Sequence, residues 1–332
     1  MIDFRYHLVS IIAVFLALAV GLLVGSTALS GIAVETLTAA EHIAQQRNAT
    51  LTKERTDLNN QLSADEAFAG AAASQLLQGQ LTGTKVVVVD APGYDPAVTS
   101  GVITALKRAG ATVTGQIIID PSFLTTDGQN EDQLTQLAQS TAGKAGVTLP
   151  AQASGPVAGQ QAAARVLAAS LLTGRGSVLS SADSAAILGQ FSQGGYVSVV
   201  NGAAPPQQAT LAVLVAPGGP APQTGSQVLV ALAVALRNAG SGTVMVGSVQ
   251  SIGAGSVISA EDTAKQVSTV DDADTETGQI MTVWALHLLL EDKAPDQYGI
   301  GPNAAPSPAP SPSPSGAQVT TSSAPTTSGG RK

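Results

Sequence analysis

The first apolar run in the chain is long enough to cross a membrane. Residues 8–29 contain no charged side chain. At about 1.5 Å per helical residue, roughly 20 such residues span a bilayer core of about 30 Å. We interpret residues 1–30 as an uncleaved anchor, because the core of a signal peptide has only about 7–15 apolar residues. The alternative is a cleaved signal peptide, with Ala28-Leu29-Ser30 as its cleavage site.

Basic residues near this run predict its orientation. Arg5 precedes the run, and the next Lys or Arg after it is Arg47. Because Lys and Arg are enriched on the cytoplasmic side of membrane helices, the N-terminus is expected in the cytoplasm and the rest of the chain outside it. The membrane is therefore the first partner that the sequence predicts, and the cell envelope is the expected location.

One face of the anchor carries small residues. Ala13, Ala17, Gly21 and Gly25 recur every fourth position, which places them on one stripe of a helix. Such a stripe allows two helices to approach closely in lipid. We expect a helix-pairing face here; the alternative is that Ala and Gly are simply abundant, since Gly alone accounts for 35 of 332 residues.

Residues 31–82 have the composition of a long helix, with no Gly or Pro between residues 32 and 69. One heptad position is occupied by Leu37, Ala44, Leu51 and Leu58. The second seam is poor, with Ala40, Arg47, Glu54 and Gln61. The spacing predicts a coiled-coil stalk and a homo-oligomer, a dimer or higher. The alternative is a helical stalk that packs on its own globular domain.

Strands and helices alternate through residues 83–300. Short β-branched runs typical of buried strands occur at 85–90, 112–119, 196–200, 211–215 and 243–246. Periodic Ala and Leu predict helices at 97–109, 131–140, 160–172, 182–193, 226–238 and 277–290. This alternation predicts an exported α/β domain with a doubly wound, mainly parallel sheet. Residues 301–332, rich in Pro, Ser and Thr, are expected to be disordered.

Composition excludes several classes of function. The net charge is −8 and only 11% of residues are charged, so the chain has no basic surface for nucleic acid. Cysteine is absent, which excludes disulfides, a thiol nucleophile and thiolate metal sites. Neither a P-loop nor a G-x-S-x-G nucleophile motif occurs, and no cofactor or catalytic residue is predicted.

The first strand-to-helix turn, Asp90-Ala-Pro-Gly-Tyr-Asp-Pro, lacks the glycines of a dinucleotide-binding turn. Asp90 and Asp120 nevertheless stand at the ends of two predicted strands. By analogy with other doubly wound folds, that edge of the sheet is a candidate ligand crevice.

An acidic cluster precedes the last helix, at Asp271, Asp272, Asp274 and Glu276. Its spacing fails the EF-hand pattern. Asp272 and Asp274 match the short acidic pair with which many glycosyltransferases hold a metal–nucleotide sugar. We interpret the cluster as helix-capping residues that complement the helix dipole, worth about 0.3–1 kcal/mol each.

Ligands suited to soft metals are sparse. The histidines are His7, His42 and His287, and the methionines are Met1, Met245 and Met281. A copper site requires clustered Met, His or Cys, so the sequence predicts no metal site. His287 lies beside Trp284 on an apolar helix face and is expected to be a core histidine.

Two segments resemble the actinobacterial MctB-like copper transporter family. The first comprises residues 1–10, 13–19 and 21–26, from Met1-Ile-Asp-Phe-Arg-Tyr-His through the anchor. The second begins with Ser-Thr-Val-Asp-Asp-Ala-Asp at 268–274 and continues through Gly278, Ala285-Leu286 and Tyr298-Gly299. The order of anchor, heptad helix, α/β body and closing acidic helix also agrees, so the resemblance covers about residues 1–300.

The resemblance implies copper export and copper resistance, through a family described as pore-forming in the outer membrane. Copper would then be a transported ion rather than a cofactor, and no ligand residue of the family maps onto this chain. One apolar helix before a water-soluble body does not by itself enclose a channel. The other hypotheses are a non-catalytic envelope scaffold that binds envelope proteins and, if Asp272 and Asp274 line a pocket, a glycosyltransferase.

Overall fold

The structure is a computed structural model that describes residues 4–149, 155, 157–174, 179–200, 208–219, 223–251, 258, 266–301 and 304–305. For residues 4–5, 26–40 and 249 it describes the backbone only. Of residues 301–332, predicted to be disordered, the structure describes 301, 304 and 305, and the N–H of Ala305 donates to the carbonyl oxygen of Gln297 at 2.7 Å. The rest of this segment lies outside the described residues.

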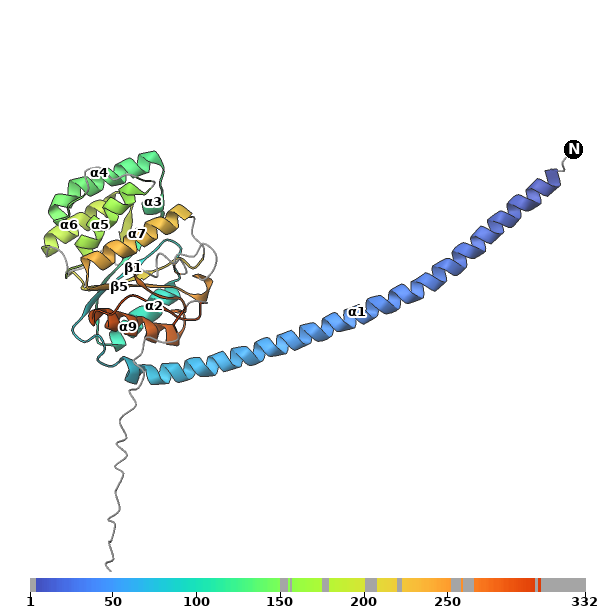
Figure 1. Cartoon of the computed structure of the whole chain (residues 1–332), viewed down its shortest axis with the longest axis horizontal. Helices are drawn as coiled ribbons and strands as arrows, with labels where there is room; N and C mark the ends of the chain where they lie inside the picture. Colours follow the sequence, from blue (N-terminus) through green and yellow to red (C-terminus); the bar gives the residue numbers. More distant parts are fainter. Residues whose placement is uncertain are drawn as a thin grey trace, which may run out of the picture. The chain divides into compact units, whose positions relative to one another are not determined.

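A single helix, α1 (Phe4–Leu77), opens the chain (Figure 1). It runs without a break from the predicted anchor into the predicted stalk, and it ends before a pair of turns in which Gly79 and Gly83 have φ values of 83° and 78°. The chain divides into two units, Met1–Ala67 and Phe68–Lys332. The first unit contains most of α1, and the second contains the α/β body together with the last turns of that helix.

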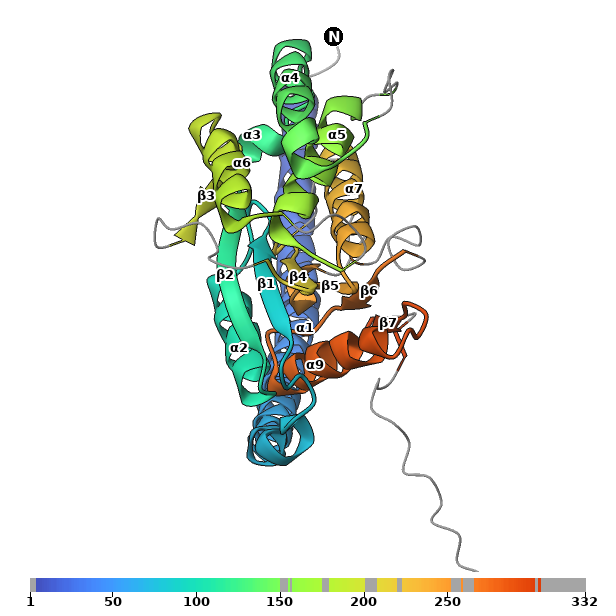
Figure 2. The same cartoon turned by 90° about the vertical axis from the view of Figure 1, so that its left-hand side faces the viewer.

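The body is built on a seven-stranded sheet in the order β3-β2-β1-β4-β5-β6-β7. Figure 2 shows the strands in this order, from β3 on the left to β7 on the right. The strands are β1 (Lys85–Asp90), β2 (Thr112–Ile119), β3 (Val197–Val199), β4 (Leu211–Val215), β5 (Gly242–Val246), β6 (Ser268–Val270) and β7 (Gln297–Tyr298). All neighbours are parallel except β3, which is antiparallel to β2. A mixed α/β body with a mostly parallel sheet, as predicted, is confirmed.

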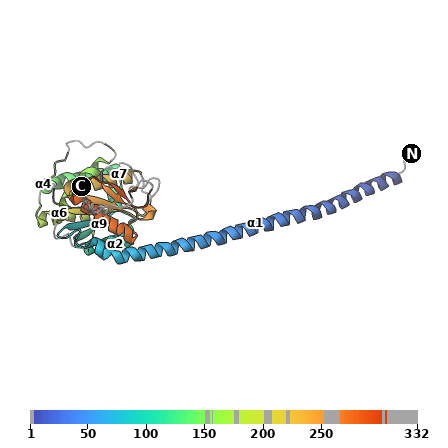
Figure 3. The same ribbon diagram turned by 60° about the horizontal axis from the view of Figure 1, so that its bottom comes forward.

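Side chains of the central strands alternate between two apolar cores because successive residues of a strand point to opposite faces. Val86 and Val88 of β1 belong to one core, together with α2 (Pro96–Arg108), α9 (Glu276–Leu290) and the end of α1. Figure 3 shows α2 and α9 side by side.

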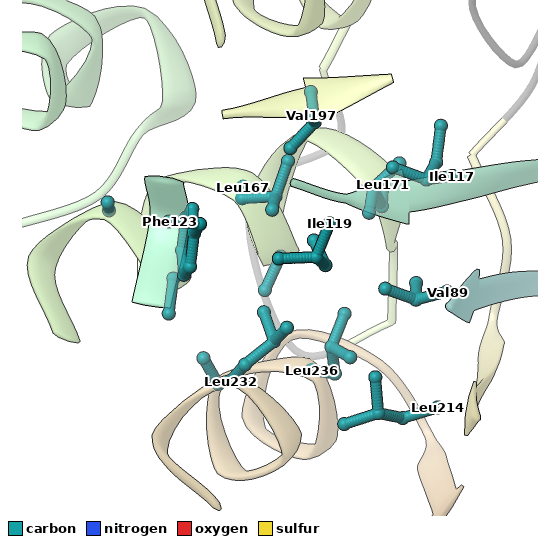
Figure 4. Packing of buried hydrophobic residues seen from close by; sticks show 14 of the residues in the cluster. Val89, Ile117, Ile119, Phe123, Leu167, Leu171, Val197, Leu214, Leu232 and Leu236 are labelled. Atoms are coloured by element: carbon teal, nitrogen blue, oxygen red, sulfur yellow. The ribbon is translucent and has the colours of Figure 1, made fainter. Parts of the chain in front are cut away.

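Val87 and Val89 belong to the core on the other face (Figure 4). The helices of that face are α4 (Gly128–Ala145), α5 (Ala158–Leu171), α6 (Ser181–Gln193) and α7 (Gln223–Ala239). A short helix, α3 (Pro121–Leu124), contributes the buried ring of Phe123, and a 3₁₀ turn, η2, covers Val249–Ser251. Both faces of the central strands are therefore covered, which explains why their sequences are continuously apolar.

Side-chain caps fix the starts of several helices. Asp95 accepts a hydrogen bond from the N–H of Ala97 at the start of α2, and Pro96 supplies the first helical residue. Ser180 caps α6, and Thr275 caps α9 by accepting from the N–H of Gly278 at 3.0 Å. These caps determine where the chain leaves a strand or loop and enters a helix.

Candidate functional site at the carboxyl edge of the sheet

The parallel strands end along one edge of the sheet. The strand order changes direction between β1 and β4. From β1 the chain continues to the neighbouring β2, whereas from β4 it continues to β5 on the other side. In open α/β sheets, ligands commonly bind outside the carboxyl ends of the strands at such a point. The candidate site is therefore centred on Asp90, the last residue of β1, as the sequence suggested.

Two glycine-containing loops meet above this position. The N–H of Ala91 donates to the carbonyl oxygen of Val215 at 2.9 Å, and the N–H of Gly218 donates to that of Gly93, also at 2.9 Å. Gly93 has a φ of 78°, a conformation that L side chains rarely adopt. The hydroxyl of Ser251 ties the second loop further by donating to the carbonyl oxygen of Pro217 at 2.8 Å. The loops are thus bonded to each other across the point where β1 meets β4.

Asp90 is fully buried beneath these loops. Its carboxylate accepts a hydrogen bond from the Thr99 hydroxyl at 2.8 Å and one from the Gln116 amide nitrogen at 2.5 Å. Burial raises the pKa of the Asp90 carboxyl above its ordinary value of 3.8, and the bonds from Gln116 and Thr99 offset part of that rise. The charge of Asp90 in turn adds to the effect of burial in raising the pKa of Tyr94.

Replacing Asp90 by Asn is expected to stabilise the protein at about pH 8 and to lose that advantage at about pH 4. A raised native pKa means that the native state holds a proton that the unfolded state releases, so wild-type stability falls as pH rises from about 4 through the native pKa. The Asn variant has no charge to bury, and its side-chain oxygen still accepts from the Thr99 hydroxyl. The side-chain amide of Gln116 can flip, so that its oxygen accepts from the side-chain N–H of the new Asn. Melting temperatures measured across this pH range test the prediction.

Asp120→Asn is the matched control, because Asp120 follows the neighbouring strand β2 but is only half-buried and accepts from the Ser198 hydroxyl at 3.0 Å. A melting-temperature difference between wild type and Asp90→Asn that does not change with pH would contradict the prediction.

At the other side of the same edge, Asp271 follows β6 and holds the closing loop of the body. Its two carboxylate oxygens accept from the N–H groups of Ile300 and Gly301 at 2.8 and 2.9 Å. Gly299 has a φ of 124°, and a Cβ on it would overlap the Asp271 carboxylate. Asp271 therefore connects two segments far apart in sequence rather than binding to the helix that follows it.

The other three residues of the acidic cluster lie in different surroundings. Asp272 is buried, and its carbonyl oxygen accepts from the hydroxyl of Thr275 at 2.8 Å, whereas Asp274 is exposed. Glu276 lies in the first turn of α9 and forms an ion pair with Arg108 of α2 at 3.1 Å. Of this segment, the side chain that caps α9 belongs to Thr275, which the sequence analysis did not name. Among the described residues, no group of three or more His, Asp and Glu side chains is placed to hold a metal ion.

His287 of α9 has two polar contacts. Its Nδ1 lies 3.0 Å from the carbonyl oxygen of Gln80, and its Nε2 lies 3.4 Å from a carboxylate oxygen of Glu291. The ring meets that of Trp284 edge-on, with ring centres 5.4 Å apart. Both ring nitrogens face partners from the protein itself, so His287 helps to attach α9 to the chain that follows α1.

In the first unit, Ala13, Ala17, Gly21 and Gly25 lie along α1, and all four are exposed. A Cβ added at Gly21 or Gly25 would meet no atom within 4 Å. They belong to Tyr6–Gly25, the one stretch of described helix that is long and apolar enough to cross a membrane. The structure leaves this face open, and the pairing of such helices stays a prediction.

Sequence reasoning missed the partners of the buried carboxylates. Thr99, Gln116 and the loop at 299–301 carry no motif, and they reach Asp90 and Asp271 only through the folded chain. The one available signal was the pairing of the 268–274 segment with Tyr298-Gly299 in the family resemblance. The contacts of Asp271 show that the beginning and the end of the second resembling segment, residues 268–274 and 298–299, lie close together in the fold.

Together, these features define a class of protein: an α/β body preceded by one continuous helix with a membrane-length apolar stretch. The chain belongs to the family described as "Copper transport outer membrane protein, MctB", whose sequence model matches residues 1–308.

Two mycobacterial relatives are similar to it over nearly their whole length. Copper transporter MctB of Mycobacterium tuberculosis (strain ATCC 25618 / H37Rv) is 29% identical over 319 residues. Copper transporter MctB of Mycobacterium leprae (strain TN) is 30% identical over 337 residues. Each alignment covers 92% of this chain and 98% of the relative. The family is named for transport.

Proposed function

We propose that this protein is a membrane-anchored component of copper export and copper resistance in the cell envelope. The observation that carries the proposal is the family match over residues 1–308, which takes in the apolar helix, the stalk and the α/β body together. The relatives that align over the same length are named copper transporters. Copper is the transported ion in this proposal and not a resident cofactor.

The mechanism that fits the chain is assistance to transport rather than a pore formed by one copy. Tyr6–Gly25 provides one membrane crossing, whereas a channel needs several helices or a closed barrel around it. The face formed by Ala13, Ala17, Gly21 and Gly25 offers no polar lining. We infer that the N-terminus lies in the cytoplasm and that the body lies outside it. We also infer that the sheet of the body is doubly wound, with the change in winding direction between β1 and β4.

Cellular copper in a deletion strain tests the proposal. Under mild copper stress, the strain without the gene is expected to accumulate more copper than the parent strain. Restoring the gene should return copper to the parental level, and restoring a copy with a disrupted apolar helix should not. Unchanged copper content in the deletion strain would overturn the proposed role.

A second candidate is a non-catalytic envelope scaffold that presents the body to other envelope proteins. It is favoured by the uninterrupted helix Phe4–Leu77, which continues well beyond what a membrane crossing needs. Titration of the purified protein with Cu(I) separates the two candidates when combined with the deletion strain. The scaffold predicts neither stoichiometric copper binding nor a change in cellular copper, whereas the export role predicts the change in cellular copper.

A further inference from the structure

A segment of α1 presents apolar side chains among polar ones. All side chains from residue 41 to residue 65 are exposed. Leu51, Leu58 and Leu62 are 61%, 64% and 56% exposed, respectively. Ala73 and Leu77, near the end of the same helix, are by contrast buried in the core of the body. A row of exposed leucines on a long helix needs an explanation that the body does not supply.

These leucines belong to a heptad seam with two rows of residues. Ala44, Leu51 and Leu58 repeat every seven residues, and a second row follows each of them at a distance of four. The second row consists of Asn48, Arg55 and Leu62. Alternating steps of four and three are the spacing of the a and d positions of a coiled coil, with the first row at d and the second at a. The second row of this seam therefore lies on one side of the first row. The residues first considered as a second row, Ala40, Arg47, Glu54 and Gln61, lie on the opposite side.

We propose that this seam binds the same seam of a second copy, forming a parallel, in-register, two-stranded coiled coil over residues 41–65. The parallel orientation follows from the helix itself. The seam and the membrane-length stretch Tyr6–Gly25 are parts of one continuous helix. Two copies anchored in the same membrane with the same orientation therefore present their stalks in the same direction.

Asn48 identifies the occupant as a second copy in register. An Asn at an a position lowers coiled-coil stability but specifies the register and the number of strands. In an in-register parallel pair, each Asn48 faces Asn48 of the other copy, so the amide of one donates to the amide oxygen of the other. An apolar groove of an unrelated protein, or a shifted register, would leave this amide facing leucines without a partner.

Arg55 adds charge complementarity to the same arrangement. An a side chain inserts into a hole formed by four residues of the opposite helix. Two of these are the a residue at the same position in the opposite helix and the g residue that directly precedes it. For Arg55 that residue is Glu54 of the second copy. The pair forms twice in a symmetric dimer, once on each side of the seam, so the two arginines extend outward to carboxylates instead of facing each other. Neither contact forms in an antiparallel pair.

Cysteine cross-linking tests the register directly, because the chain contains no cysteine of its own. Leu51→Cys and Leu58→Cys place single thiols in the seam of the full-length protein. Lys53→Cys and Asn60→Cys place them on the opposite face and serve as matched controls. A disulfide needs its two Cβ atoms about 3.5–4.5 Å apart, which a d position facing its own counterpart provides.

After mild oxidation in membrane vesicles, the two seam variants should run as dimers on a non-reducing gel and the two controls as monomers. Seam variants that stay monomeric would overturn the proposal. Equal cross-linking at all four positions would overturn it as well, because it would report random collisions.

The mass of the full-length protein in detergent tests the number of strands. Wild type should have the mass of two chains, and Leu51→Glu combined with Leu58→Glu should have the mass of one. Lys53→Glu combined with Asn60→Glu is the control that adds acidic residues to the outer face and should stay dimeric. A wild type with the mass of one chain, or of three or more, would overturn the proposal. This outcome is separate from the copper assay, since the assembly does not depend on what the body transports or binds.

Discussion

Replacing Gly278 by Ala should destabilise the body by at least about 3 kcal/mol, the upper end of the usual cost of overpacking. Gly278 lies in the first turns of α9, where its N–H donates to the cap residue Thr275. A Cβ at this position would overlap the backbone carbonyl group of Asp272, which no rotamer change can move away. For a body of this size the loss corresponds to a fall in melting temperature of roughly 6–12 °C. Thermal unfolding of the full-length protein in detergent, followed by circular dichroism, measures it.

Gly143→Ala provides the matched control for this substitution. Gly143 is an exposed residue inside α4, and a Cβ added there would meet no atom within 4 Å. An Ala in a helix interior is favoured over Gly by about 0.5–1 kcal/mol, so this variant should melt at a slightly higher temperature than wild type. If both variants shifted the melting temperature equally, the close approach of α9 to Asp272 would not be the cause.

Two arginines in the middle of the apolar stretch should remove the protein from the membrane. Each Arg at the centre of a membrane helix costs about 2.5–3.5 kcal/mol, so Leu16→Arg combined with Val20→Arg costs roughly 5–7 kcal/mol. Because about 1.4 kcal/mol corresponds to a factor of ten, the ratio of inserted to non-inserted protein should fall at least about 10³-fold. The measured quantity is the fraction of protein that stays in the membrane pellet after extraction with alkaline carbonate.

The same two charges placed in the stalk test whether position matters. Gln46→Arg combined with Thr50→Arg has the same spacing on an exposed part of α1 and should leave the protein in the pellet. N-terminal sequencing of wild type distinguishes the anchor from a cleaved signal peptide. A chain that begins at Met1 supports the anchor, whereas one that begins at Gly31, after the Ala28-Leu29-Ser30 site, and is extracted by carbonate would show that the apolar stretch is removed.

The central strands could be predicted because burial on both faces leaves a plain pattern in the sequence. The prediction for 85–90 agrees with β1, and that for 211–215 agrees with β4. The helix predicted at 182–193 agrees closely with α6 (Ser181–Gln193). Ser180, which caps its start, and Gly194, which follows its end, are local signals for these boundaries. Local rules of periodicity, capping and termination determine these elements, so one stretch of sequence suffices to find them.

The edge strands could not be predicted because nothing local marks them. β6 is a three-residue strand that includes Ser268 and Thr269, and β7 has only two residues. Both are strands only because β5 offers a free edge to β6, and β6 to β7. The direction of β3 is a similar case. The sequence predicts a strand there, but its antiparallel pairing with β2 depends on the path of the four helices, α3 to α6, that the structure describes between them.

The candidate site divides in the same way. Asp90 could be located from sequence as the end of a buried strand, but its burial and its bonds to Thr99 and Gln116 depend on how α2 and β2 pack. Asp271 was read as part of a helix cap, because the residues after it form a helix. Its hydrogen-bond partners, Ile300 and Gly301, lie beyond the far end of that helix, so only the folded chain brings them together.

The position of β1 in the middle of the sheet has a consequence for how the body folds. One edge of β1 pairs with β2, which follows after a single helix, and the other pairs with β4, where Val86 is matched with Leu211. Non-local pairings of this kind slow folding, because a long loop must close before they stabilise the chain. Until residues 211–215 are in place, β1, with its four consecutive valines, keeps one edge open to other chains. We therefore expect refolding in which β1, β2 and α2 assemble early and the closure by β4 sets the overall rate.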